Sequence, residues 1–195
     1  FGSDRTVFIP LEGNNMAMRQ MEPKWYHGRD LMQPVGEAKN IIKQLGIKIV
    51  VVDDTGVGGG VTDALREWVN TTPEYKHVRI IAVNFGGVSE HPEEFLNIKA
   101  EILWGLREQL REGTIQILDK GSLLAELPTL KYKYTSKQQL QIVSKEEMKK
   151  KGIRSPDFTD ALALARHGLM MVSRKNTVMI DKQPGVLGNV RSKKF

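Results

Sequence analysis

Three aspartates lie where carboxylates could do chemistry. Asp53 directly follows the apolar run at 47–52, and Asp157 and Asp160 open the last predicted helix. In open α/β sheets, ligands gather outside the carboxyl ends of buried strands such as this run. A carboxylate there is costly unless a cation or hydrogen bonds compensate its charge. A purely structural alternative is a loop residue that caps the next helix, a role that Asp54 fits better than Asp53.

The spacing of the two later aspartates favours a shared site. Asp157 and Asp160 are three positions apart and therefore share one helix face, although acids in a first turn also suit the helix dipole. Ser155 is the predicted N-cap, and small apolar residues at 161–165 favour close packing that would bring the acidic start near Asp53. Carboxylates converging in a chain without cysteine suit Mg²⁺ or Mn²⁺ rather than zinc. Two such ions would stabilise the attacking and leaving oxygens of a phosphodiester displacement.

A glycine-rich turn at 53–60 follows the same strand. It lacks the Lys-Ser/Thr pair of a Walker loop and does not have the spacing G-x-G-x-x-G. The glycines could instead let the backbone turn sharply and approach a neighbour closely. An actin-like or sugar-kinase-like ATPase that uses this turn as a phosphate loop stays open as an alternative.

The net charge of +6 is concentrated in two short segments. Residues 145–154 hold five basic and two acidic side chains, and residues 173–195 hold six basic and one acidic. A localised basic surface suits a polyanion such as nucleic acid, whereas the alternative is a solvated helix and a loose tail. The cations just ahead of Asp157, which we expect to contact DNA, are Lys145, Lys149, Lys150, Lys151 and Arg154.

The elements that must position these side chains read as one α/β domain with a mixed sheet. The 195 residues include no apolar run long enough to span a membrane, and no secretion signal is expected at the N-terminus. Trp25, Trp68 and Trp104 are predicted to lie in the core. The expected strands are 5–12, 16–26, 47–52, 78–83, 115–118, 132–134 and 140–143. The expected helices are 34–45, 61–69, 93–112, 145–151 and 155–172.

Five motifs in order resemble the nuclease domain of tailed-phage large terminases. They are FGSDRTV at 1–7, VVDDTGVG at 51–58, NIKAE at 97–101, SKEEMK at 144–149 and SPDFTDAL at 155–162. The resemblance spans residues 1 to 172 and implies an RNase H-like fold, a mixed β-sheet flanked by α-helices. It also implies a metal-dependent endodeoxyribonuclease that cuts concatemeric phage DNA during packaging in the host cytoplasm. Double-stranded DNA, the portal protein and the small terminase subunit are the implied partners.

The resemblance assigns roles to individual residues. Two catalytic aspartates of the family carry over to Asp53 and Asp157, and Asp160 matches a position that is commonly acidic. The family's first catalytic aspartate lies a few residues before the segment that begins at Phe1, on a strand expected upstream, and Asp4 is a further candidate ligand. Mg²⁺ or Mn²⁺ is the implied cofactor.

The expected organisation is a nuclease domain at 1–172 followed by a basic, flexible tail at 173–195. One further alternative stays open beside the nuclease and the ATPase. The chain could be a DNA- or portal-docking module without chemistry of its own, with the basic segments as its working surface.

Overall fold

The computed structural model describes residues 5–27, 32–55, 58–118 and 121–181, with side chains as far as residue 172. Its helices are α1 (Met32–Leu45), α2 (Gly58–Thr71), α3 (Ile98–Glu112), α4 (Ser122–Glu126), α5 (Lys145–Lys150) and α6 (Asp157–Asp181). Its strands are β1 (Arg5–Phe8), β2 (Leu11–Gly13), β3 (Met18–Gln20), β4 (Lys24–His27), β5 (Ile49–Asp53), β6 (Arg79–Val83), β7 (Ile115–Gln116), β8 (Tyr132–Tyr134) and β9 (Leu140–Ile142).

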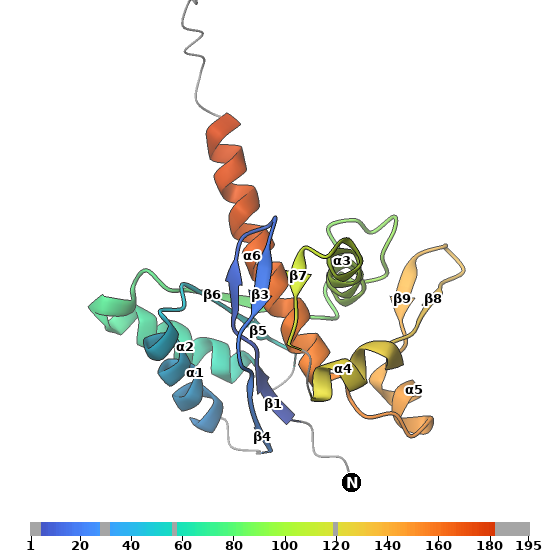
Figure 1. Ribbon diagram of the computed structural model, residues 1–195, viewed down its shortest axis with the longest axis horizontal. Coiled ribbons are helices and arrows are strands. Elements are labelled where there is room, and N and C mark those ends of the chain that lie inside the picture. The colour runs from blue at the N-terminus through green and yellow to red at the C-terminus, as the bar shows by residue number, and fades with distance from the viewer. Residues whose placement is uncertain (1–4, 28–31, 56–57, 119–120, 182–195) are drawn as a thin grey trace, which may run out of the picture.

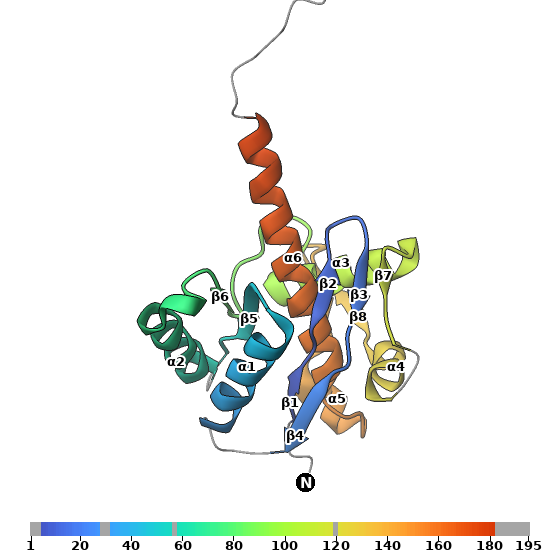
Figure 2. The same cartoon turned by 60° about the vertical axis from the view of Figure 1, so that its left-hand side comes forward.

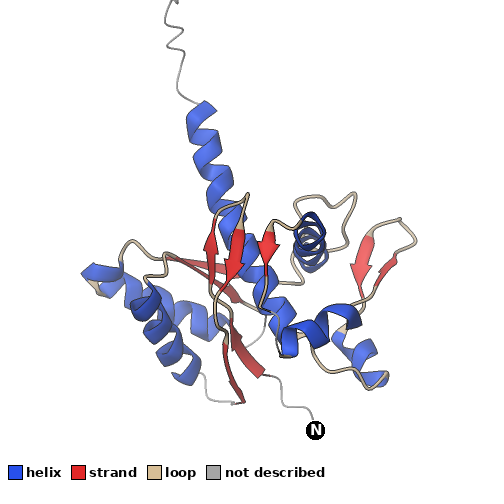
Figure 3. Ribbon diagram, viewed as in Figure 1, coloured by secondary structure: helices blue, strands red, loops and turns tan. Residues whose placement is uncertain are grey.

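Helices cover the strands on two sides, as Figures 1 and 3 show. The strands β5 and β6, each expected from an apolar run, lie in the middle and pair with each other in parallel. Val50 and Val52 of β5 pack with α1 and α2, whereas Val51 packs into the cluster to which α3 and α6 contribute. A Cβ at Gly168 of α6 would collide with the Val51 side chain. The last helix therefore lies close against β5, as its small residues predict.

The strands predicted at 5–12 and 16–26 pair as a hairpin, with a break in its middle. β1 pairs with β4, and β2 pairs with β3, in antiparallel register. Phe8 faces Lys24 and Leu11 faces Gln20, so the returning strand has one extra residue between the two halves. Pro10 lies at this break and has no N–H to donate to a ladder. Figure 2 shows the hairpin running alongside α6.

Three helix predictions need correction. α3 begins at Ile98 rather than at residue 93, because Asn97 is extended and its side chain accepts the N–H of Ala100 at 3.0 Å. α2 begins at Gly58, so it includes glycines that were predicted to be in the turn. The backbone of α6 continues to Asp181, beyond the predicted end at 172. Within the described part of the chain, no helix combines the length and the apolar character that a bilayer span needs.

Candidate metal centre

Asp53 is the last residue of β5, and strand alternation decides which way it faces. Val51 packs on the α6 side and Val52 on the α1 and α2 side. Because successive side chains of a strand point to opposite faces, Asp53 lies on the α6 side. Its Oδ1 accepts the N–H of Thr55 at 3.1 Å, and the residue is partly buried.

The turn after Asp53 supports the close-approach interpretation of its glycines. A Cβ at Gly58 would collide with the carbonyl oxygen of Asp53, so a glycine is needed for α2 to begin this close to the strand end. Asp54 Oδ1 accepts the hydroxyl hydrogen of Thr62 in α2 at 2.7 Å. Asp54 thus ties the loop to α2 through a side chain, whereas the predicted role was to cap the helix.

Asp157 is the first residue of α6, and donors surround it. Its Oδ2 accepts the backbone N–H of Arg5 at 3.1 Å and lies 3.5 Å from Arg5 Nε. Its Oδ1 accepts the hydroxyl hydrogen of Ser155 at 2.5 Å. The prediction that Ser155 is the N-cap is wrong, because α6 begins at Asp157 and Pro156 is the residue directly before it.

Asp160 lies one turn along α6 and is 6% exposed. Its Oδ2 lies 2.9 Å from Lys99 Nζ and 3.4 Å from Lys145 Nζ, and Lys145 Nζ also lies 3.6 Å from Asp157 Oδ1. The structure therefore brings Asp157 and Asp160 together beside one shared lysine. Asp160 Oδ1 is buried and has no hydrogen-bond partner among the described residues.

Glu126 of α4 is a member of this cluster that sequence reasoning missed. Its Oε1 lies 2.5 Å from Arg5 Nη2, and its Oε2 accepts the N–H of Thr159 at 3.0 Å. Burial raises the pKa of the Glu126 carboxyl above its ordinary value, against the lowering effects of the Thr159 N–H and the Arg5 charge. No local pattern marks Glu126, since α4 is a helix of five residues without a side-chain cap.

The donor set fits a hard divalent cation in its chemistry. Carboxylate oxygens are the ligands that Mg²⁺ and Mn²⁺ prefer, and Asp160 Oδ1 is a buried acceptor without a donor. Within the described ranges, no three His, Asp or Glu side chains lie close enough together to hold one ion. Asp53 is thus on the same side of the sheet as α6 but is not grouped with Asp157 and Asp160. Asp4 lies outside the described residues.

The predicted basic segment divides into two parts. Lys149, Lys150, Lys151 and Arg154 are exposed, on α5 and the residues after it. Lys145 has a side chain 36% exposed and lies beside the carboxylates of α6. Four of the five cations are therefore open to an external polyanion. Lys145 instead belongs to the carboxylate cluster, the group formed by Asp157, Asp160 and Glu126 with the cations beside them.

The surface near Asp157 includes an aromatic ring that was expected in the core. Trp25 is 50% exposed, so its predicted core position is wrong. Its ring lies edge-on to that of Phe158, with 6.1 Å between the ring centroids. Trp25 on β4 therefore contacts the residue that follows Asp157 in the chain.

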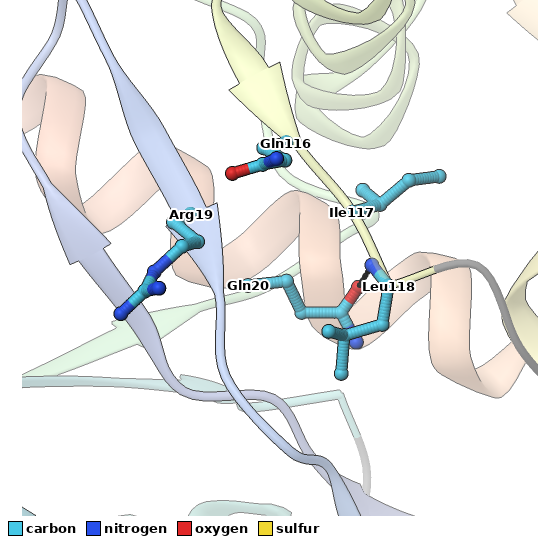
Figure 4. A pocket seen from close by; sticks show the side chains of 5 residues that line it. All are labelled: Arg19, Gln20, Gln116, Ile117 and Leu118. Carbon is cyan, nitrogen blue, oxygen red and sulfur yellow. Dashed lines mark hydrogen bonds between the residues drawn. The ribbon is translucent and has the colours of Figure 1, made fainter.

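Two shallow pockets lie over β3 and β7, and neither is lined by the aspartates. Figure 4 shows the smaller one, of about 230 Å³, where Gln20 Oε1 accepts the N–H of Leu118 at 3.2 Å. Arg19, Gln116 and Ile117 complete its lining. No carboxylate lines this pocket.

The solved structures to which this chain is similar include nuclease domains of phage large terminases. The domain from bacterial virus Sf6 matches at a TM-score of 0.66 and 19% identity, over 84% of this chain and 86% of that chain. The magnesium-bound nuclease of thermophilic phage G20c matches at a TM-score of 0.57 and 17% identity, over 86% of this chain and 83% of that chain. The expected RNase H-like α/β fold is therefore confirmed. No family model and no curated protein sequence matches the chain.

Proposed function

We propose that this chain is the nuclease domain of a phage large terminase, a metal-dependent endonuclease that cuts concatemeric double-stranded DNA. The observation that carries the proposal is the pairing of Asp157 and Asp160 at the start of α6, on the side of the sheet that Asp53 faces. The shared fold supports it, because the neighbours are described as terminase nucleases with manganese, magnesium or cobalt.

In this proposal Asp53 and Asp157 hold Mg²⁺ or Mn²⁺, with help from Asp160. Asp4, or an aspartate preceding Phe1, supplies a further carboxylate. The bound ions would stabilise negative charge on the attacking and leaving oxygens of the phosphodiester. The chain's own donors orient the Asp157 carboxylate, through the Arg5 N–H and the Ser155 hydroxyl.

The exposed cations of the basic segment supply the DNA contact. Lysines on a short helix beside the carboxylates are placed to touch phosphates, which fix position but read no sequence. We expect the tail at 173–195 to add non-specific attraction. The portal protein and the small terminase subunit are the further partners, and the host cytoplasm is the place of action.

A second candidate is a DNA-docking module without chemistry. The observation that favours it is charge balance, because Arg5, Lys99 and Lys145 already lie against Asp157 and Asp160. Such ion pairs are also found in purely structural clusters. Cleavage of DNA separates the two candidates.

The deciding experiment is cleavage of supercoiled plasmid in Mn²⁺ or Mg²⁺ by the wild type and three single variants. We expect Asp53→Asn and Asp157→Asn to abolish cleavage. Asp54→Asn is the matched control, because it keeps the acceptor that binds Thr62 and should still cut. Circular dichroism checks that each variant is folded.

Three results would overturn the proposal. Cleavage by Asp157→Asn at the wild-type rate would remove the assigned site. A wild type that binds DNA but never cuts would favour the docking module. ATP binding by the chain would favour the ATPase alternative.

A further inference from the structure

Glu126 is a buried carboxylate that has no role in the proposed cleavage reaction. It is 6% exposed, and it comes from α4, far along the chain from α6. A buried charge is retained at a cost in free energy unless it is well paired, so its contacts show what it does.

Both oxygens of Glu126 are already engaged. Oε1 lies 2.5 Å from Arg5 Nη2, while Oε2 accepts the Thr159 N–H at 3.0 Å and the Thr159 hydroxyl hydrogen at 3.3 Å. Thr159 itself is fully buried. These contacts join Glu126 to Arg5 and to the first turn of α6.

The contacts of Glu126 lead to Asp157 by two routes. In the first route, Glu126 accepts the N–H of Thr159 in the first turn of α6. The N–H groups at a helix start have no partner within the helix, so this bond fixes the turn that carries Asp157. In the second route, Glu126 holds the Arg5 guanidinium, whose Nε lies 3.5 Å from Asp157 Oδ2. Two further contacts hold Arg5. Its Nη1 donates to Ser122 Oγ at 3.3 Å, and its Cζ lies 4.8 Å from the centroid of the Phe158 ring.

We propose that Glu126 is a positioning residue for Asp157, acting through Arg5 and through the first turn of α6. The inference rests on the proposed function, since Asp157 is there the metal ligand. Residues that orient metal ligands through hydrogen bonds typically change metal affinity when they are replaced. Glu126 therefore sets the affinity for the ion without touching it.

The test is Mn²⁺ binding by the full chain, followed by loss of the free-ion electron paramagnetic resonance signal and independent of cleavage. We expect Glu126→Gln to weaken Mn²⁺ binding about 10–100-fold. Gln109→Ala is the matched control, because Gln109 is also 6% exposed and its Oε1 accepts Arg166 Nε of the same helix at 2.6 Å, away from the first turn. It should lower the melting temperature and leave the Mn²⁺ affinity unchanged.

The outcomes separate this inference from the proposed function. If wild type binds no Mn²⁺, or Asp157→Asn binds it as wild type does, the metal centre itself is wrong. If Asp157→Asn loses binding while Glu126→Gln binds as wild type does, the positioning role alone is overturned. Equal weakening by Glu126→Gln and Gln109→Ala would also overturn it, since general loosening of α6 would then be the cause. Should Glu126→Gln fail to fold, the double variant Arg5→Met with Glu126→Gln removes both buried charges, and the same outcomes apply to it.

Discussion

Helices α5 and α6 follow one another in the chain, yet their first turns are held in opposite ways. α5 is capped by the residue directly before it, because Ser144 Oγ accepts the N–H of Glu147 at 3.2 Å. The first turn of α6 is bonded from another element, by Glu126, 33 residues before Thr159. A local cap fixes where a helix begins along the chain, whereas a distant one also fixes where the helix lies in the fold.

The two helices also differ in what they present. α5 turns Lys149 and Lys150 outward, while Asp157 and Asp160 of α6 face Lys99 and Lys145. An outward lysine needs no exact placement to attract a polyanion, whereas a carboxylate that must hold a metal ion does. In the proposed function, the distant cap is therefore on the helix whose carboxylates need exact placement.

The largest effect is expected from Glu126→Ala, which tests whether the distant contact of α6 contributes more to stability than the local cap of α5. This substitution leaves the Arg5 guanidinium, only 12% exposed, without its closest anion. Removing one partner of a buried ion pair costs about 3–5 kcal/mol in the free energy of unfolding. Urea unfolding in metal-free buffer measures the loss, and a change no larger than that of Ser144→Ala would refute the contrast.

The outward charges of α5 are tested by Lys149→Ala combined with Lys150→Ala. Removing one lysine that neutralises a phosphate should reduce the slope of log affinity against log salt by roughly 0.9. Duplex binding is titrated with salt in a Ca²⁺ buffer, which we expect to block cutting. Lys39→Ala with Lys43→Ala on α1 is the control, and an unchanged slope in the α5 variant would place the DNA track elsewhere, most directly along residues 84–92.

Ser144→Ala tests the local cap of α5. Loss of a local N-cap costs about 1 kcal/mol. We expect the loss to be confined to α5, so that Mn²⁺ binding stays at the wild-type level while thermal unfolding begins earlier. A variant that lost Mn²⁺ binding would show that α5 also positions the carboxylates.

The smallest expected effect is on pH dependence. Burial raises the pKa of Glu126, so the folded chain keeps a proton that the unfolded chain has lost, and stability from this group falls as pH rises through that interval. The hydrogen bond and charge of Lys133 lower the pKa of Glu147, so its contribution is lost as pH falls. Urea unfolding between about pH 3 and pH 7 should show opposite slope changes in Glu126→Gln and Glu147→Gln. Parallel changes would contradict these assignments.

Sequence patterns predict the parts of this fold that depend on neighbours in the chain. The two strands of the hairpin and the strands β5 and β6 follow from apolar runs and turn residues, and Asp53 lies at the end of one such run. The position of Asp157 in the first turn of α6 follows from the residues typical of a helix start. The α6 first-turn bond to Glu126 could not be predicted, because it joins elements that only tertiary packing brings together. Lys145 shows the same limit, since it shares a basic run with Lys149 but lies against the carboxylates.

The break in the hairpin has a consequence for the neighbourhood of Asp157. Because the returning strand has one extra residue there, Val7 faces Trp25 and Phe8 faces Lys24. Directly opposed residues share a face, and a slip by one position exchanges the two faces of a strand. Had the register of β2 and β3 continued into β1 and β4 with no residue left over, Lys24 would lie opposite Val7 and Trp25 opposite Thr6. The indole ring would then lie on the other face of the strand, away from the Phe158 ring that it now contacts.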